Sequence, residues 1–168
     1  IKGFTDHFYR TYCKGDLESV LSATKLMKRE GVHVEITNLI IPGINDSLDE
    51  IRQLSIWVRD SLGKDSPLHF SRFFPHYKMA DRPPTPFETL FKAKKIAEEE
   101  GLQFVYIGNV PGEGENTHCP NCKHLLIRRM GFDVLKVDLS KGNTCPNCGF
   151  KINIVGNANA RTFSRWFY

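Results

Sequence analysis

The sequence has no apolar run near the roughly 20 residues that a membrane-spanning helix needs, so we expect no membrane association. It shows no signal peptide, which predicts a cytoplasmic protein with reduced cysteines. No initiator methionine precedes Ile1, which reads as the end of a strand, and we expect an excerpt from a longer protein. The 168 residues, 40% hydrophobic and 25% charged, suit one globular domain or a domain plus a small module.

Cysteine is scarce, yet four of the five cysteines lie in two copies of one tetrapeptide. These are Cys119-Pro-Asn-Cys122 and Cys145-Pro-Asn-Cys148, and 22 residues separate them. Two thiolates at this spacing can bind one metal from a tight turn, and two such turns complete a tetrahedral four-sulfur shell. Disulfides or free thiols are the weaker alternative, because the chain has no secretory features. The sequence therefore predicts a metal site formed by Cys119, Cys122, Cys145 and Cys148.

The predicted site suits structural zinc, and it also suits a single iron as in rubredoxin. We favour zinc, because no electron-transfer partner is evident. Four protein ligands leave no open position, so we expect no hydrolytic catalysis there. His118 and His124 flank the first pair and are expected beside the ligands or in solvent. Between the pairs, a hairpin of residues 125–129 and 134–138 is predicted, with the metal supplying much of its stability.

The positive charge is concentrated in the cysteine-containing part. Residues 117–168 carry eight Lys or Arg and two Asp, whereas residues 1–116 carry 15 Lys or Arg and 17 acidic residues. A zinc ion with four thiolates has a net charge of −2, so nearby cations partly neutralise it. The charge is therefore weak support for nucleic-acid binding, which we do not expect. The basic, aromatic tail 157–168 is expected to pack on its own domain or on a partner.

Residues 1–116 alternate between helical and strand patterns. Helical periodicity begins at Asp16, at Asp46 or Ser47, and after Thr85, whose segment Thr85-Pro-Phe-Glu88 has the form of a capping box. The expected strands are residues 33–41, 68–73 and 102–107. Such alternation predicts an α/β fold with parallel strands, in which ligands bind at the carboxyl ends of the strands. Three and a half units of this kind form either part of a barrel or a small open sheet.

Four segments carry a resemblance to a known family. They are Ile1-Lys-Gly-Phe4, Asn38-Leu-Ile-Ile-Pro-Gly-Ile-Asn-Asp46, Ser71-Arg-Phe-Phe-Pro-His-Tyr-Lys78 and Thr117-His-Cys-Pro-Asn-Cys122. In order and spacing they resemble the C-terminal part of AmmeMemoRadiSam-type proteins of the radical S-adenosylmethionine (radical SAM) superfamily. These are relatives of the pyruvate formate-lyase activating enzyme. The resemblance runs to about Gly156.

This resemblance implies the C-terminal half of a radical SAM (β/α)6-type barrel over residues 1–116. A zinc ribbon over 117–156 and the tail 157–168 would follow. It further implies a parent enzyme in which a 4Fe-4S cluster and S-adenosylmethionine generate a 5′-deoxyadenosyl radical. That radical abstracts hydrogen from a protein or small-molecule substrate.

The resemblance also implies contacts to S-adenosylmethionine. Lys2 matches a lysine that closes the fourth strand and contacts the methionine or ribose part, although a solvated lysine is the alternative. Ile41 and Gly43 match residues on the adenine side. Asn38 either is satisfied in the core or points into the cofactor cavity. His76 is a weaker candidate, because the family's histidine stands one residue later, at Tyr77 here.

The cluster motif C-x3-C-x2-C and the G-G-E motif of the family are absent from this chain. We therefore expect the chain alone to be inactive, and we assign it no catalytic residue. The alternative interpretation is a non-enzymatic zinc-ribbon module that binds a protein or nucleic acid. Half of a barrel leaves sheet edges open, so self-association is also predicted.

Overall fold

The computed structural model describes residues 1–110 and 112–156 and divides the chain into two compact units. The division falls between Val110 and Pro111, inside segment 108–116, which contains three glycines and one proline. The expected packing of the tail 157–168 lies outside the described residues. Within the two described ranges, no helix is both long and apolar enough to cross a membrane.

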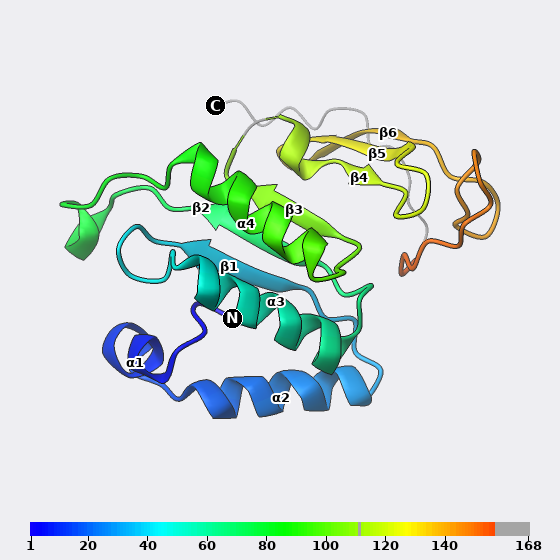
Figure 1. The fold of residues 1–168 in the computed structure, drawn as a ribbon. Coiled ribbons are helices and arrows are strands. Elements are labelled where there is room, and N and C mark those ends of the chain that lie inside the picture. Colours follow the sequence, from blue (N-terminus) through cyan, green and yellow to red (C-terminus); the bar gives the residue numbers. More distant parts are fainter. Residues whose placement is uncertain (111, 157–168) are drawn as a thin grey trace. The chain divides into compact units, whose positions relative to one another are not determined.

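A three-stranded parallel sheet forms the centre of the first unit (Figure 1). Its strands are β1 (Ile36–Ile40), β2 (Leu68–Arg72) and β3 (Val105–Gly108), hydrogen-bonded in that order. In register, Leu68 lies between Ile36 of β1 and Val105 of β3. The parallel pairing and the mixed α/β class confirm what the alternation of patterns predicted.

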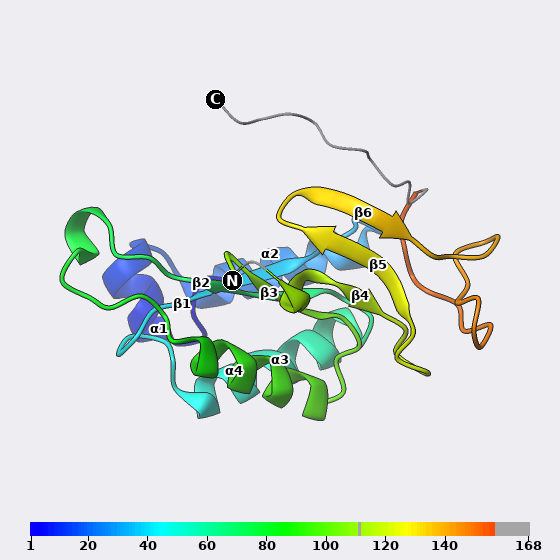
Figure 2. The same ribbon diagram turned by 90° about the horizontal axis from the view of Figure 1, so that it is seen from above.

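The first unit has three long helices, two of which form a layer on one face of the sheet. The short elements are α1 (Asp6–Phe8), a π-helical turn η1 (Tyr9–Cys13) and a 3-10 turn η2 (Tyr77–Met79), and the long helices are α2 (Leu17–Arg29), α3 (Leu48–Leu62) and α4 (Phe87–Glu99). Figure 2 shows α3 and α4 on the same side of the sheet, and α2 packs beside α3. Because strand side chains alternate between faces, every second one points toward these helices. The buried residues of the strands are Ile36, Asn38, Ile40, Leu68, Phe70, Val105 and Ile107.

The opposite face of this sheet is covered by no helix of the first unit. Thr37 is exposed there, and the side chains that follow it on this face are only partly buried. They are Leu39, His69, Ser71 and Tyr106. Parallel sheets usually have both faces covered, so one open face is unusual for a sheet of this kind.

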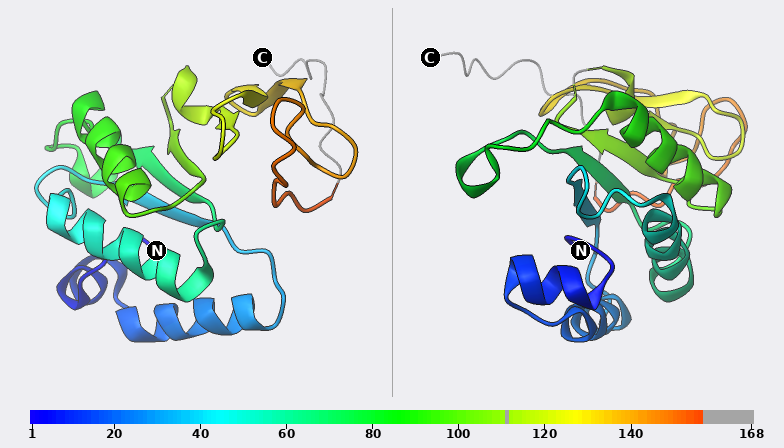
Figure 3. Two further views of the ribbon diagram at one scale, coloured as in Figure 1. Left: turned by 45° about the vertical axis from the view of Figure 1, so that its right-hand side comes forward. Right: turned by 60° about the vertical axis from the view of Figure 1, so that its left-hand side comes forward.

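The second unit is a small antiparallel sheet with long loops (Figure 3). Its elements are η3 (Glu113–Glu115), β4 (Thr117–His118), β5 (Leu125–Met130) and β6 (Asp133–Val137). The β5–β6 pair confirms the predicted hairpin, and Arg128 lies opposite Lys136 in it. Leu126, Ile127 and Ile152 supply its buried aliphatic side chains.

The predicted capping box at Thr85 is wrong, because Thr85 instead satisfies backbone groups at the carboxyl ends of strands. The Thr85 hydroxyl donates to the Ile40 carbonyl at 2.6 Å and accepts from the Phe73 amide at 2.8 Å, and Pro86 is the N-cap residue of α4, without a side-chain hydrogen bond. Thr85 is fully buried, where unpaired backbone groups are costly, and this need outweighs a cap at the surface. Of the two residues predicted at the start of α3, Ser47 is the N-cap residue, without a side-chain hydrogen bond, and Asp46 accepts from the Gly43 amide.

Candidate metal centre

The first cysteine pair sits in a tight turn between β4 and β5. The Lys123 amide donates to the Cys119 carbonyl at 2.9 Å, and the Cys119 amide donates to the His124 carbonyl at 2.8 Å. Lys123 has a left-handed backbone conformation, with φ of 61°. These bonds reverse the chain so that the sulfurs of Cys119 and Cys122 can face one ion.

The second pair repeats the same geometry after β6. The Gly149 amide donates to the Cys145 carbonyl at 2.9 Å, and the Cys145 amide donates to the Phe150 carbonyl at 2.9 Å. Gly149 has φ of 72°, matching the left-handed position of Lys123. The repeated tetrapeptide therefore folds into a repeated turn, with glycine at the left-handed position of the second turn and lysine in the first.

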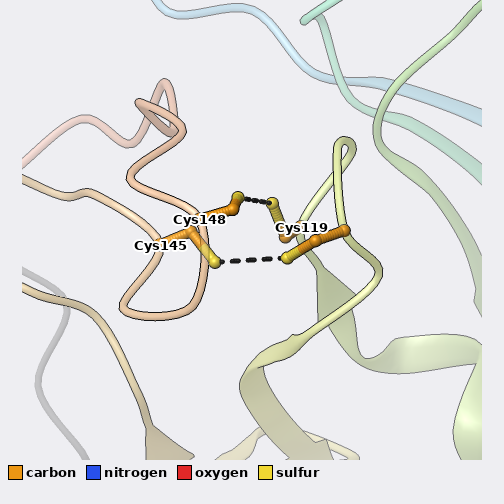
Figure 4. Close-up of side chains that lie close together, drawn as sticks. Cys119, Cys145 and Cys148 are labelled. Carbon is orange, nitrogen blue, oxygen red and sulfur yellow. Dashed lines mark hydrogen bonds between the residues drawn. The ribbon is translucent and has the colours of Figure 1, made fainter.

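The four sulfurs converge from the two turns (Figure 4). The Sγ atoms of Cys119 and Cys148 are 3.6 Å apart, as are those of Cys122 and Cys145, and all four lie within 4.8 Å of one another. A tetrahedral shell with metal–sulfur bonds of about 2.3 Å has sulfur–sulfur edges of about 3.8 Å. The predicted cluster is therefore confirmed as a group able to hold one metal ion, and its cysteines are not disulfide-bonded.

The four thiols differ in burial and acidity. Burial raises the pKa of the Cys119 thiol to about 11. The side chain of Asn147 and the backbone amide of His124 lower the pKa of Cys122 to about 6. The side chain of Asn121, in the first turn, lowers the pKa of Cys148 in the second. Each turn thus stabilises a thiolate of the other turn, and a bound divalent cation would favour the thiolate form of all four.

The histidines beside the first turn are not part of the sulfur cluster. His124 pairs through Nε2 with Asp138 Oδ2 at 2.8 Å, and this hydrogen bond lowers the pKa of the Asp138 carboxyl. The Asp138 amide donates to the Leu126 carbonyl at 2.7 Å, which fixes the strand position of the carboxylate. His118 is exposed on β4. His124 therefore braces the end of the hairpin next to the metal site.

The residues matched to cofactor contacts lie in the first unit, around the end of β1. Lys2 has an exposed side chain, and its carbonyl accepts from Asn45 Nδ2 at 2.8 Å and from Asn38 Nδ2 at 3.2 Å. Asn38 is buried on the helix-covered side of β1, and among the described residues its Oδ1 has no hydrogen-bond partner. Asn38 is thus buried, but only its Nδ2 is satisfied, and its contact with a cofactor stays a prediction.

Ile41, Gly43 and His76 occupy the loops at the same edge. The buried Ile41 donates its amide to Asn45 Oδ1 at 2.7 Å. Gly43 is exposed with φ of 72°, and an added Cβ would meet only Arg82 Nη1, at 3.6 Å. Gly43 is therefore required by its backbone conformation rather than by crowding. His76 is exposed and precedes η2, with no hydrogen bond to the other matched residues.

Sequence reasoning missed two groups in this unit. Asn45 joins Lys2, Leu39 and Ile41 through one amide, and its position in a turn after a strand was the available signal. Glu35 accepts from His69 at 2.8 Å and from His33 at 3.0 Å, just before β1. Side chains two residues apart in a strand point to the same face, so His33, Glu35 and Thr37 form a polar row on one face of the predicted strand. This spacing was the available signal in the sequence.

The chain is 54% identical over 157 residues to a protein of Methanocaldococcus jannaschii named "Uncharacterized protein MJ0808". The match covers 92% of this chain and 47% of the relative, so the chain spans about half the length of the curated relative that it matches. No protein-family model matches the chain.

Proposed function

We propose that this chain is the C-terminal part of a radical SAM enzyme, made of half of a (β/α) barrel followed by a structural zinc ribbon. The observation that carries this proposal is the one-sided covering of the parallel sheet by α3 and α4. A doubly wound sheet has helices on both faces, whereas a (β/α) barrel has all of its helices outside. The uncovered face with Leu39, Ser71 and Tyr106 would then line the barrel interior.

The first residues support the same architecture. The Ile1 amino group donates to the Thr37 carbonyl at 3.2 Å, and Asn38 and Asn45 hold the Lys2 carbonyl. Residues 1 and 2 therefore run along the outer edge of β1, where a preceding barrel strand would lie. The matched region covers 47% of the relative, so a protein of the relative's length has room for the other half of a barrel.

The edge of β1 offers groups suited to S-adenosylmethionine. The exposed Lys2 ammonium would pair with the cofactor's carboxylate, and Ile41 and Gly43 would lie on its adenine side. Gly43 is exposed, and a ligand there would lie beside Arg82 Nη1, which is 3.6 Å from the position of an added Cβ. Asn38 would act by positioning the backbone of Lys2, and His76 remains the weaker candidate. When bound, S-adenosylmethionine with a 4Fe-4S cluster supplies hydrogen-atom abstraction from a protein or small-molecule substrate.

The four-cysteine site would hold zinc in this proposal. Its ligand set is closed, and its spacing differs from that of the family's cluster motif, so it would stabilise the ribbon rather than react. This chain by itself would then bind zinc but perform no radical chemistry.

The test uses the longer protein encoded by the reading frame upstream of Ile1, purified without oxygen. We expect the motifs C-x3-C-x2-C and G-G-E upstream, about four irons and four sulfides besides one zinc, and 5′-deoxyadenosine release on reduction with S-adenosylmethionine. Lys2→Ala should weaken S-adenosylmethionine binding at least tenfold, whereas Lys95→Ala, on the exposed side of α4, should leave it unchanged. Absence of the upstream motifs, or about four irons in the present chain alone, would overturn the proposal.

A further inference from the structure

Two cations lie directly opposite each other in the β5–β6 hairpin. Arg128 and Lys136 are register partners, and both side chains are exposed. Among the described residues the Arg128 guanidinium makes no hydrogen bond or ion pair, and Lys136 has only Asp138, at 3.8 Å. Like charges opposite each other destabilise a strand pair. An anion bound between them would remove this repulsion.

The metal site does not account for this pair of cations. Ile127 pairs with Thr117 of β4, and Arg128 lies one residue farther from the first cysteine turn. Strands rise about 3.4 Å per residue, which places Arg128 about 10 Å along the strand from Leu125, the first residue of β5. This is beyond the screening length of about 8 Å at physiological salt. Charge compensation of the thiolates therefore applies to Lys123, next to Cys122, and much less to Arg128.

The tip of the same hairpin presents an aromatic ring to solvent. Phe132 is fully exposed, and Met130 beside it is half exposed. The turn is held in place, because Gly131 donates its amide to Glu115 Oε2 at 2.8 Å and Arg129 donates to the Glu115 carbonyl at 3.0 Å. An exposed phenyl ring on a fixed turn is a ready stacking surface.

We propose that the β5–β6 hairpin binds single-stranded nucleic acid. Arg128 and Lys136 contact phosphates of one strand, and Phe132 stacks on an unpaired base. Cations that follow a backbone, together with an aromatic ring for a base face, are the two features by which proteins hold single strands. The acidic groups around this hairpin are Glu115 and Asp133 near the tip and Asp138 beside Lys136, and the cations Arg128, Arg129 and Lys136 match them in number. A duplex is the poorer fit, because its bases are stacked and offer Phe132 no free face.

This inference is independent of the proposed radical SAM parent, since it rests on the second unit alone. A ribbon of this kind would bring a nucleic acid to the protein whatever chemistry the first unit supports.

The test measures fluorescence anisotropy of labelled oligonucleotides with the full, zinc-loaded chain. The probes are a uridine strand and a thymidine strand of about 20 nucleotides and a duplex of the same length, between about 50 and 200 mM salt. Arg128→Ala/Lys136→Ala should weaken single-strand binding at least tenfold and reduce the slope of log K against log salt by about 1.4. Phe132→Ala should weaken binding at least fivefold and leave the slope unchanged.

The matched control is Arg29→Ala/Lys95→Ala, which removes the same charge from exposed positions on α2 and α4. It should change affinity less than twofold, and each variant should retain one zinc per chain. Tight binding of either single strand with these responses supports the proposal. It is overturned by absent binding at the lowest salt, by a control that loses as much as the hairpin variants, by tighter binding of the duplex, or by affinity that survives all three hairpin substitutions.

Discussion

Lys123 and Gly149 occupy equivalent positions in the two cysteine turns, each with a left-handed backbone. Glycine adopts this conformation freely, whereas a residue with a Cβ loses about 1 kcal/mol or more. The first turn therefore carries a conformational cost that the second turn does not. Metal–sulfur bonds would offset this cost, because they would fix the turn regardless of which residue follows Cys122.

Lys123→Gly should stabilise the second unit by about 1 kcal/mol, since it relieves the left-handed lysine. The measurement is the midpoint of unfolding with zinc held at a fixed free concentration. Lys123→Ala is the matched control, because it removes the same charge and retains the Cβ. If the alanine variant gains as much as the glycine variant, the effect comes from charge and not from the backbone.

Cys122→Ser should abolish tight metal binding, because three thiolates cannot close the four-sulfur shell. Cys13→Ser is the control, since Cys13 is exposed in η1 and belongs to the other unit. Metal content after gel filtration measures both variants. We expect about one zinc per chain in Cys13→Ser and less than a tenth of that in Cys122→Ser. Equal metal in the two variants would show that the ion lies elsewhere.

At the scale of elements, Glu35 links the segment before β1 to β2 through His69. The ring of His69 also stacks on Tyr106 of β3, with centroids 5.0 Å apart. Hydrogen bonds from His69, and more weakly from His33, lower the pKa of Glu35 to about 2 from its usual 4.5. These contacts tie the three strands together on the uncovered face, at the end opposite to the matched cofactor residues.

A lowered pKa means that the Glu35 interactions stabilise the fold above about pH 4.5 and are lost as the pH falls toward about 2. The difference in unfolding free energy between the natural chain and Glu35→Gln should therefore shrink across this window. The carboxylate is 46% exposed, so solvent reduces the effect. Urea unfolding at a series of pH values measures it, with Glu30→Gln as an exposed control. A difference that stays constant from pH 6 to pH 2 would contradict this assignment.

At the scale of the whole molecule, the two units differ in what stabilises them. The first unit has a continuous core between its sheet and α3 and α4, which includes Leu54, Phe70 and Leu90. The second unit buries few aliphatic side chains in its described part, and four of its cysteines converge on one point. Its folding should therefore depend on the ion, whereas folding of the first unit should not.

Removal of the metal with a chelator should unfold the second unit alone. Amides of β5 and β6 should then exchange with solvent within seconds, while those of β1 and β2 stay protected, because hydrophobic packing holds them. Hydrogen exchange followed by mass spectrometry resolves the two units, and restored zinc should restore protection. Protection of β5 that survives complete metal removal would show that its packing suffices without the ion.

The first unit should also self-associate. Within its described residues, β3 has β2 as its single hydrogen-bonded neighbour, and one face of the sheet has no helix over it. An open edge of this kind is a template for pairing with a second copy. Light scattering should show a mass that rises with protein concentration. A constant monomer mass over a hundredfold range would contradict the prediction.

The sequence by itself determined the features that depend on local spacing. The two Cys-Pro-Asn-Cys segments predicted the metal cluster, because a turn of two residues fixes the distance between its sulfurs. Helical and strand periodicities predicted the parallel sheet, since they record which side chains each element buries. The radical SAM resemblance stays a prediction that the longer protein must test.

Only the tertiary structure decided which distant groups meet. Thr85 donates to the Ile40 carbonyl, 45 residues away, and Asn38 donates to the Ile1 carbonyl, 37 residues away. Such contacts depend on how the strands and loops pack. The register of β5 and β6 likewise set Arg128 against Lys136, which no spacing along the chain could show. Hydrogen bonds within a turn are specified by neighbours in sequence, whereas contacts between elements are specified by burial of the whole core.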